Sequence, residues 1–162
     1  MKNYLLVIII IMLSVPVYSQ VVNEEITLEY INRCYNYLKK PVPNGFFSTG
    51  KTNIIRNGTK YENQVGDTFL YVANNVVYFS SFGLLFELTN AANRFHAMII
   101  DALETTNWKY YGKTPFNDMD IYIKNNVGAL VGPVRRRSSD KLLIVSVNFI
   151  TEEDFTEMFD YP

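Results

Sequence analysis

Few side chains in this 162-residue chain could act as a nucleophile, a base or a zinc ligand, because it contains one cysteine, Cys34, and one histidine, His96. A serine hydrolase needs a serine beside a histidine base, and no G-x-S-x-G motif accompanies His96. One cysteine and one histidine also predict no zinc site. Cys34 shares a helical spacing with Ile26, Tyr30 and Leu38, which favours a buried thiol over a nucleophile.

Carboxylate pairs are the remaining route to hydrolysis. Asp67, Asp101, Glu104 and Asp118 could converge in the folded chain, but their spacing in the sequence does not predict the separation that glycoside cleavage requires. The acidic group at 117–120 resembles the start of a calcium loop without its glycine and terminal glutamate, so we interpret it as turn capping. No phosphate-binding glycine loop or dinucleotide motif occurs. We therefore expect no catalytic residue, metal or cofactor.

The most distinctive chemical feature is the run Arg135, Arg136 and Arg137, which we place at a loop tip between two strands. Guanidinium groups bind carboxylates and phosphates through paired hydrogen bonds, so this run is a candidate binding site. The alternatives are a solvated hairpin tip and a partner for the acidic residues near the end of the chain, Glu152, Glu153, Asp154 and Glu157.

Aromatic residues make up 15% of the chain, with 12 tyrosines and 11 phenylalanines. Most should lie in the core or on the sheet, because aromatic side chains favour strands. An exposed patch of them beside the arginines would favour a binding role. The candidates for the binding site are Tyr110, Tyr111 and Tyr122, and Tyr71 and Tyr78 could extend the patch.

The amino-terminal segment is typical of a signal peptide. Lys2 precedes an apolar run at 4–13, and Val17 and Ser19 occupy the small-residue positions of a cleavage site before Gln20. A membrane anchor is the alternative, but a spanning helix needs about 20 apolar residues and this run is near half that. We predict cleavage of residues 1–19, an exported product that is periplasmic or secreted, and no membrane insertion of the mature chain.

The mature chain, residues 20–162, has the length of one domain. The full chain has 15 basic and 16 acidic residues; without Lys2 the basic residues number 14, which gives a net charge of −2. This balance shows no basic footprint for nucleic acid, so we expect no nucleic-acid partner.

Two helices and a series of short strands must position the candidate residues. Helical spacing predicts a helix at 24–39 capped by Asn23. It predicts a second helix, capped by Thr89 or Asn90, that runs to about Thr105 and is marked by Ala91, Phe95, Met98, Ile99, Ala102 and Leu103. Strand patterns begin at Phe46 and continue at 67–73, 76–82, 84–88, 108–111, 119–124, 127–131 and 142–149. The alternation within 119–124 predicts one buried face.

Turn residues separate these strands. We predict hairpin turns at Asn57–Gly58, at Asn74–Asn75 and at Asn125–Asn126, because asparagine and glycine accept positive φ. Gly83 predicts a bend or bulge that ends one strand before the next.

The expected fold class is α+β. It consists of an antiparallel β-meander sheet of about six to eight strands, the two main helices on one face, and a short carboxyl-terminal helix at about 152–158. The segments 67–76 and 118–127 share an aspartate, a tyrosine and Asn-Asn in the same register, which indicates either a duplicated αβ-meander unit or two hairpins that converged on similar turns.

These observations favour a non-catalytic binding or interaction module of the periplasm or cell envelope, with a protein or an envelope component as its partner. The alternatives are an envelope-directed hydrolase that uses a carboxylate pair, and an inhibitor-like protein that caps a partner's site.

Overall fold

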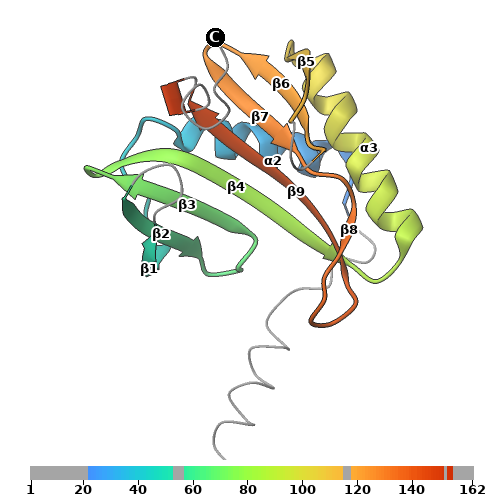
Figure 1. The fold of residues 1–162 in the computed structure, drawn as a ribbon, viewed down its shortest axis with the longest axis horizontal. Coiled ribbons are helices and arrows are strands. Elements are labelled where there is room, and N and C mark those ends of the chain that lie inside the picture. Colours follow the sequence, from blue (N-terminus) through green and yellow to red (C-terminus); the bar gives the residue numbers. More distant parts are fainter. Residues whose placement is uncertain (1–21, 53–56, 115–117, 152, 155–162) are drawn as a thin grey trace, which may run out of the picture.

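Two helices pack against one face of an antiparallel sheet, to which the described residues contribute nine strands (Figure 1). This computed structural model describes residues 22–52, 57–114, 118–151 and 153–154. The helices are α2 (Glu24–Tyr37) and α3 (Thr89–Thr105). The strands are β1 (Phe46–Thr52), β2 (Gly58–Asn63), β3 (Thr68–Ala73), β4 (Val76–Phe86), β5 (Lys109–Lys113), β6 (Asp120–Lys124), β7 (Val127–Val131), β8 (Arg135–Arg136) and β9 (Leu143–Thr151). The predicted α+β fold, with both helices on one face, is confirmed.

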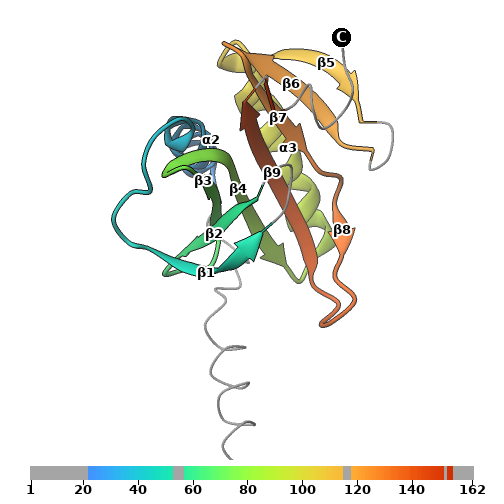
Figure 2. The same cartoon turned by 60° about the vertical axis from the view of Figure 1, so that its left-hand side comes forward.

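The strand order of the sheet is β1-β2-β3-β4-β9-β7-β6-β5, and β8 pairs with β9 beyond the end of β7. Each helix precedes a meander, and the last strands of the two meanders, β4 and β9, pair along the middle of the sheet. Figure 2 shows the strong twist of this open sheet. The two similar segments lie in the β3–β4 and β6–β7 hairpins, and a duplicated unit stays a prediction.

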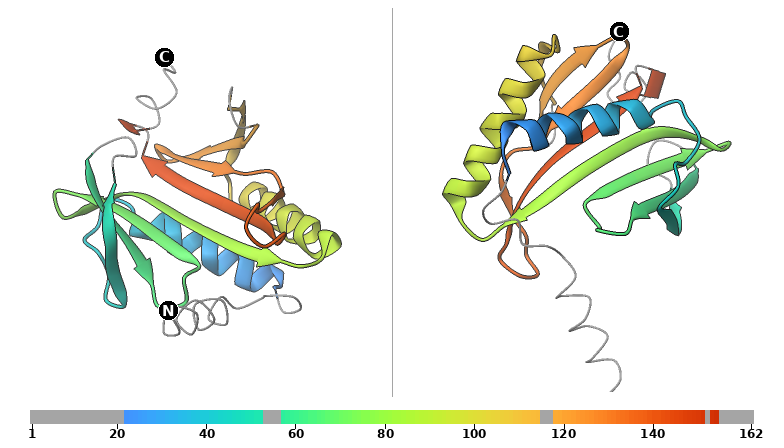
Figure 3. Two further views of the ribbon diagram at one scale, coloured as in Figure 1. Left: turned by 60° about the horizontal axis from the view of Figure 1, so that its bottom comes forward. Right: turned by 180° about the vertical axis from the view of Figure 1, so that it is seen from behind.

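Both helices begin close to their predicted positions. The Asn23 side chain accepts a hydrogen bond from the Ile26 amide at 2.9 Å, which caps α2 as expected. At α3 the predicted caps are wrong: Leu88 holds the cap position without a side-chain bond, and Thr89 and Asn90 belong to the first turn. Figure 3 shows α2 and α3 from behind, both on the same side of the sheet.

The two Asn-Asn turns are confirmed. Asn74 and Asn75 have φ of 52° and 63°, and Asn125 and Asn126 have φ of 47° and 61°. These left-handed conformations match the right-handed twist of the flanking strands, and asparagine tolerates them better than most residues do.

Two glycine predictions are wrong. Gly58 is the first residue of β2 and pairs with Thr52, so it is no turn residue. A Cβ at Gly58 would lie 2.5 Å from the carbonyl oxygen of Val72 on β3, and this close approach is what requires glycine. Gly83 ends no strand, because β4 continues through it and Gly83 pairs with Ser146.

The arginine run is not a loop tip. Arg135 and Arg136 form β8 and pair with Ile144 and Leu143 of β9. No sequence pattern predicted this strand, because two residues show no periodicity. With β8 the sheet has nine strands, one more than the upper end of the expected range. The tip of this hairpin lies further along the chain, at 138–140.

The main core fills the space between the helices and the sheet. The ring of Phe82 stacks on Tyr30 and Phe149, with centroid distances of 5.1 and 6.3 Å, and lies 6.4 Å from Phe95. Cys34 is fully buried in this core, as predicted. The packing of α2 and α3 on the sheet therefore depends on aromatic contacts.

The face of the sheet opposite the helices, called the open face below, carries a smaller cluster. Ile121, Leu130 and Ile150 are buried there. The prediction of one buried face for 119–124 is wrong, because Tyr122 on the same strand is buried in the main core. Both faces of β6 are therefore covered.

Some expectations lie outside the described residues. These are the signal peptide at 1–19 and most of the carboxyl-terminal helix, of which only Glu153 and Asp154 are described, both helical. In the part of the chain that the structure describes, no helix is both long enough and apolar enough to cross a membrane.

Gly58 gives a test of the sheet packing. We expect Gly58→Ala to destabilise the protein by about 1–3 kcal/mol, because the added Cβ meets the backbone of Val72. Gly83→Ala is the matched control, since its nearest contact, the Cβ of Ser146, would be an ordinary 3.5 Å. Urea unfolding of both variants measures the difference. Equal stability of the two variants would contradict the described packing of β2 on β3.

Candidate functional site

A pocket of about 230 Å³ opens on the open face, between the β2–β3 turn, β4 and the β8–β9 hairpin (residues 135–144). We call it the open-face pocket. It is lined by Glu62, Val65, Gly66, Asp67, Phe69, Gly83, Leu84, Leu85, Arg137 and Ile144. It lies below the usual volume of a site that encloses a drug-sized ligand, so it suits one small apolar group.

The floor of the open-face pocket is apolar and its walls are charged. Phe69 of β3, Leu85 of β4 and Ile144 of β9 form the floor. Glu62 lies on β2 and Arg137 follows β8, and the sheet order places β3, β4 and β9 between them. A carboxylate and a guanidinium therefore stand on opposite sides of an apolar floor.

The sheet separates the three predicted arginines. Arg135 pairs with Ile144 and Arg136 with Leu143, and paired residues project to the same face. Ile144 lines the open-face pocket, whereas Leu143 belongs to the main core. Arg135 therefore lies on the open face and Arg136 on the helix side, and Arg137 lines the pocket.

Arg137 is oriented by its own hairpin. Its Nη2 lies 3.1 Å from Asp140 Oδ2 and donates to Ser139 Oγ at 3.2 Å. Its amide donates to the Leu142 carbonyl at 2.7 Å, which continues the pairing of the hairpin. Arg137 therefore has a local acidic partner, Asp140. Of the acidic residues predicted as partners near the end of the chain, Glu152 and Glu157 lie outside the described residues.

The structure does not bring the predicted tyrosines to the arginines. Tyr110 and Tyr111 lie on the edge strand β5 and are each 54% exposed, while Tyr122 is 3% exposed and packs edge-on against Tyr110 at 5.4 Å. Two strands, β6 and β7, separate β5 from β9. Tyr78 is buried, and the half-buried Tyr71 on β3 packs edge-on against Phe79 at a centroid distance of 5.0 Å.

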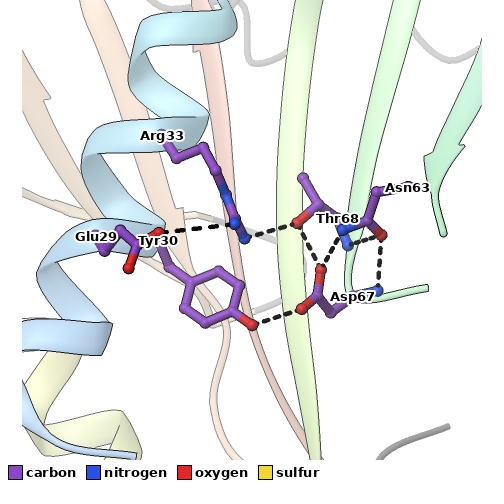
Figure 4. A network of polar contacts seen from close by, with 6 residues as sticks. All are labelled: Glu29, Tyr30, Arg33, Asn63, Asp67 and Thr68. Atoms are coloured by element: carbon purple, nitrogen blue, oxygen red, sulfur yellow. Dashed lines mark hydrogen bonds and ion pairs between the residues drawn. The ribbon is translucent and has the colours of Figure 1, made fainter. Parts of the chain in front are cut away.

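A buried polar network holds one wall of the open-face pocket (Figure 4). The carboxylate of Asp67 accepts hydrogen bonds from Tyr30 Oη at 2.5 Å, from Asn63 Nδ2 at 2.7 Å and from Thr68 Oγ1 at 2.8 Å. Asp67 is 6% exposed. Burial of a carboxylate is costly unless its oxygens are bonded, and here both oxygens have partners.

The side chain of Asn63 also bonds to the backbone of the β2–β3 turn. Its Oδ1 accepts hydrogen bonds from the amides of Gly66, Asp67 and Thr68 at 3.0, 3.2 and 3.2 Å. The Asp67 carbonyl in turn accepts from the Gly83 amide of β4 at 2.9 Å. The β2–β3 turn is thus fastened to α2, to itself and to β4.

Arg33 extends the network toward solvent. Its Nη2 donates to Thr68 Oγ1 at 3.3 Å, its guanidinium carbon lies 4.5 Å from the ring centroid of Tyr30, and Glu29 lies 4.0 Å away. Burial acts to lower the pKa of Arg33, but its neighbours, Asp67 foremost, raise that pKa above its ordinary value. The positive charge of Arg33 is therefore retained near the buried carboxylate.

The structure gives little support for Cys34 as a nucleophile or for His96 as a base. Burial raises the pKa of the Cys34 thiol to about 12, so it is protonated at neutral pH. His96 is half-buried on α3 beside the Gly132 backbone, and burial lowers its pKa. Neither residue lines the open-face pocket. Among the described residues, no three His, Cys, Asp or Glu side chains could hold a metal ion.

The predicted carboxylates do not converge. Asp118 pairs with Lys113 at 3.2 Å, Glu104 accepts weakly from Tyr122 at 3.4 Å, and Asp101 is exposed on α3. Asp67 reaches the open-face pocket with both carboxylate oxygens already bonded.

Glu62 and the residues of the apolar floor, Phe69, Leu85 and Ile144, were not among the predicted site residues. Glu62 lies in a polar strand with no pattern to mark it, whereas Phe69 alternates with the buried residues Thr68 and Leu70, a signal that could have placed it on the opposite face. Ile144 shows the same alternation within β9. Glu62, Phe69 and Ile144 line one pocket with Arg137 because of the order of the strands in the sheet, which no local sequence pattern predicts.

Comparisons of the chain with protein-family models, with curated proteins and with solved structures found no significant match. One fold can host many unrelated functions, so function must be inferred from the site. The site here combines an apolar pocket, two opposed charges and a rigid buried support.

Tyr30 tests the polar network. We expect Tyr30→Phe to lower the free energy of unfolding by about 1.5–3 kcal/mol, because it removes a buried hydrogen bond to a carboxylate. Tyr110→Phe is the control: its hydroxyl also faces an aspartate, Asp120, but at 3.4 Å and in solvent, so we expect a change within about 0.5 kcal/mol. Urea unfolding measures both. Similar values for the two variants would show that the Asp67 network contributes no special stability.

Proposed function

We propose that the protein is an exported, non-catalytic binding module of the periplasm or cell envelope, and that its ligand or partner binds at the open-face pocket. The observation that carries this proposal is the position of Arg137, a binding residue nominated by the sequence that lines a pocket with an apolar floor. Pockets of this composition use a few placed polar groups to orient a ligand over apolar contacts.

Local charge supports an acidic group on the partner. Residues 135–141 contain three arginines and one lysine against one aspartate, in a chain whose net charge is −1. Arg135 and Arg137 share the open face, and a guanidinium can bind a carboxylate through two parallel hydrogen bonds. The partner therefore combines an apolar group with an acidic one.

The two alternatives differ in support. A carboxylate-pair hydrolase would have to use Glu62 with Asp67, and Asp67 is buried and already accepts hydrogen bonds from Tyr30, Asn63 and Thr68. An inhibitor that caps a partner's site would use the same hairpin, so it is a special case of the binding module in which the partner is an enzyme.

Pull-down from the solubilised envelope of the source organism tests the binding role. Protein produced from the full chain should retain a partner that the double variant Arg135→Ala/Arg137→Ala loses, because both side chains lie on the open face. Arg136→Ala is the matched control and should retain the partner, since Arg136 lies on the helix side. Mass spectrometry identifies the partner.

Two outcomes of the pull-down would count against the proposal. If Arg136→Ala lost the partner to the same extent as the double variant, binding would depend only on the positive charge of the arginine run and not on the open face. Retention of no protein or envelope component by any of the three would remove the support for a binding module. A partner enzyme that is inhibited by the wild-type protein would favour the capping role.

Export is tested separately at the amino terminus. We expect the mature protein, recovered from the periplasm or the medium, to begin at Gln20, because Val17 and Ser19 fit a signal-peptidase site. Intact-mass measurement and amino-terminal sequencing read the cleavage site. Ser19→Phe, which places a bulky residue next to the cut, should leave the precursor uncleaved. A wild-type product that retains Met1 in the membrane fraction would instead support an anchor.

A further inference from the structure

The opposed charges of the open-face pocket point to the kind of ligand it would hold. Glu62 and Arg137 both line the pocket, and β3, β4 and β9 lie between the elements that carry them. A ligand that lies across the apolar floor therefore meets an anion at one end and a cation at the other. A purely anionic ligand would satisfy Arg137 and be repelled by Glu62.

We propose that the open-face pocket binds a short apolar peptide with free termini, its ammonium group toward Glu62 and its carboxylate toward Arg137. This proposal rests on the proposed binding function and names the ligand class of the same site. An apolar side chain of the peptide occupies the part of the floor that Leu85 and Ile144 form, beside the Phe69 ring over which the Lys60 ammonium lies.

Glu62 is available for an ammonium group. It forms no ion pair with any described residue. The Lys60 ammonium, two residues away on the same strand, lies 4.2 Å from the ring centroid of Phe69, the cross-strand partner of Glu62. A Cβ at Gly66 would lie 3.1 Å from Glu62 Oε1, so the carboxylate lies directly against the backbone of the β2–β3 turn. The network of Asp67 holds that turn in place.

Arg137 can bind a ligand carboxylate if that carboxylate replaces Asp140, its present partner. Its partner Asp140 is three residues away on the same hairpin, and the two side chains are 41% and 33% exposed. Exposed ion pairs of this kind contribute little to stability, so a ligand carboxylate can replace Asp140 at small cost. Asp140 then acts as a local substitute that keeps Arg137 oriented when the pocket is empty.

The width of the site favours a peptide over a single amino acid. Neighbouring strands lie about 4.8 Å apart, and four strand spacings separate β2 from β8, so a flat sheet would place their backbones roughly 19 Å apart. The side chains of Glu62 and Arg137 and the twist of the sheet close part of that distance. Three residues at about 3.5 Å each span roughly 10 Å, about half of that backbone separation, whereas one amino acid spans less than about a fifth of it.

Isothermal titration calorimetry with alanyl-leucyl-alanine tests the proposal. Its leucine supplies the apolar group, and two blocked forms, N-acetylated and carboxyl-amidated, each remove one terminal charge. On protein produced from the full chain, we expect each block to weaken binding by about fivefold or more, because each removes a charge-assisted hydrogen bond. The glycine analogue, alanyl-glycyl-alanine, should also bind more weakly.

Two variants assign the ends of the peptide. Arg137→Gln should bind the free and the amidated peptides equally while it still discriminates against the acetylated one, and Glu62→Gln should show the reverse. Arg136→Gln, on the helix side, and Glu87→Gln, exposed after β4, are matched controls and should behave as wild type. Circular dichroism confirms that each variant is folded.

The proposal is overturned if the blocked peptides bind as tightly as the free one, or if no tripeptide binds. Should no tripeptide bind while the pull-down still shows a partner that depends on Arg135 and Arg137, the ligand class is wrong and the binding module stands. A discrimination against both blocks that is unaffected by Arg137→Gln and Glu62→Gln would place the peptide site elsewhere and also overturns the proposal.

Discussion

The buried carboxylate of Asp67 is the constraint on which the candidate site depends. Three donors from three elements converge on it: Tyr30 from α2, Asn63 from the end of β2 and Thr68 from the start of β3. Because an unpaired buried carboxylate is costly, these donors cannot move apart without a penalty larger than that of an ordinary surface hydrogen bond. The turn is therefore fixed against α2 and against Gly83 of β4, and the wall of the open-face pocket that includes Glu62 is fixed with it.

The central pairing of β4 and β9 sets the other wall. β9 pairs with β4 on one side and with β8 on the other. Side chains alternate between the two faces along β9, and paired residues share a face. The burial of Leu143 in the main core therefore fixes which arginines of β8 lie on the open face. A loop tip would have left all three guanidinium groups free to point in any direction. The strand instead assigns Arg135 and Arg137 to one face and Arg136 to the other, and it supplies rigidity that a surface loop lacks.

Much of the local structure could be predicted from the sequence, because its signals act over a few residues. Asn23 caps α2 through its own side chain, and the Asn-Asn turns follow from the tolerance of asparagine for positive φ. Predictions failed where the cause lay on another strand. Gly58 is explained by the Val72 carbonyl on β3, and β8 exists only because β9 is present to pair with it. Glu62 could not be predicted as a site residue for the same reason. Its position opposite Arg137 depends on the order of five strands and on no pattern within either segment.

The distribution of charge on this fold favours recognition over reaction. A general acid or base must exchange its proton with a substrate, and Asp67 directs both oxygens to the protein itself. Glu62 and Arg137 have the opposite character: they carry opposite charges on elements that three strands separate, an arrangement that supports the proposed binding of a ligand with two charged ends. Charges fixed on rigid strands also lose little freedom when they bind, which is the condition under which a small pocket can discriminate between charged ligands.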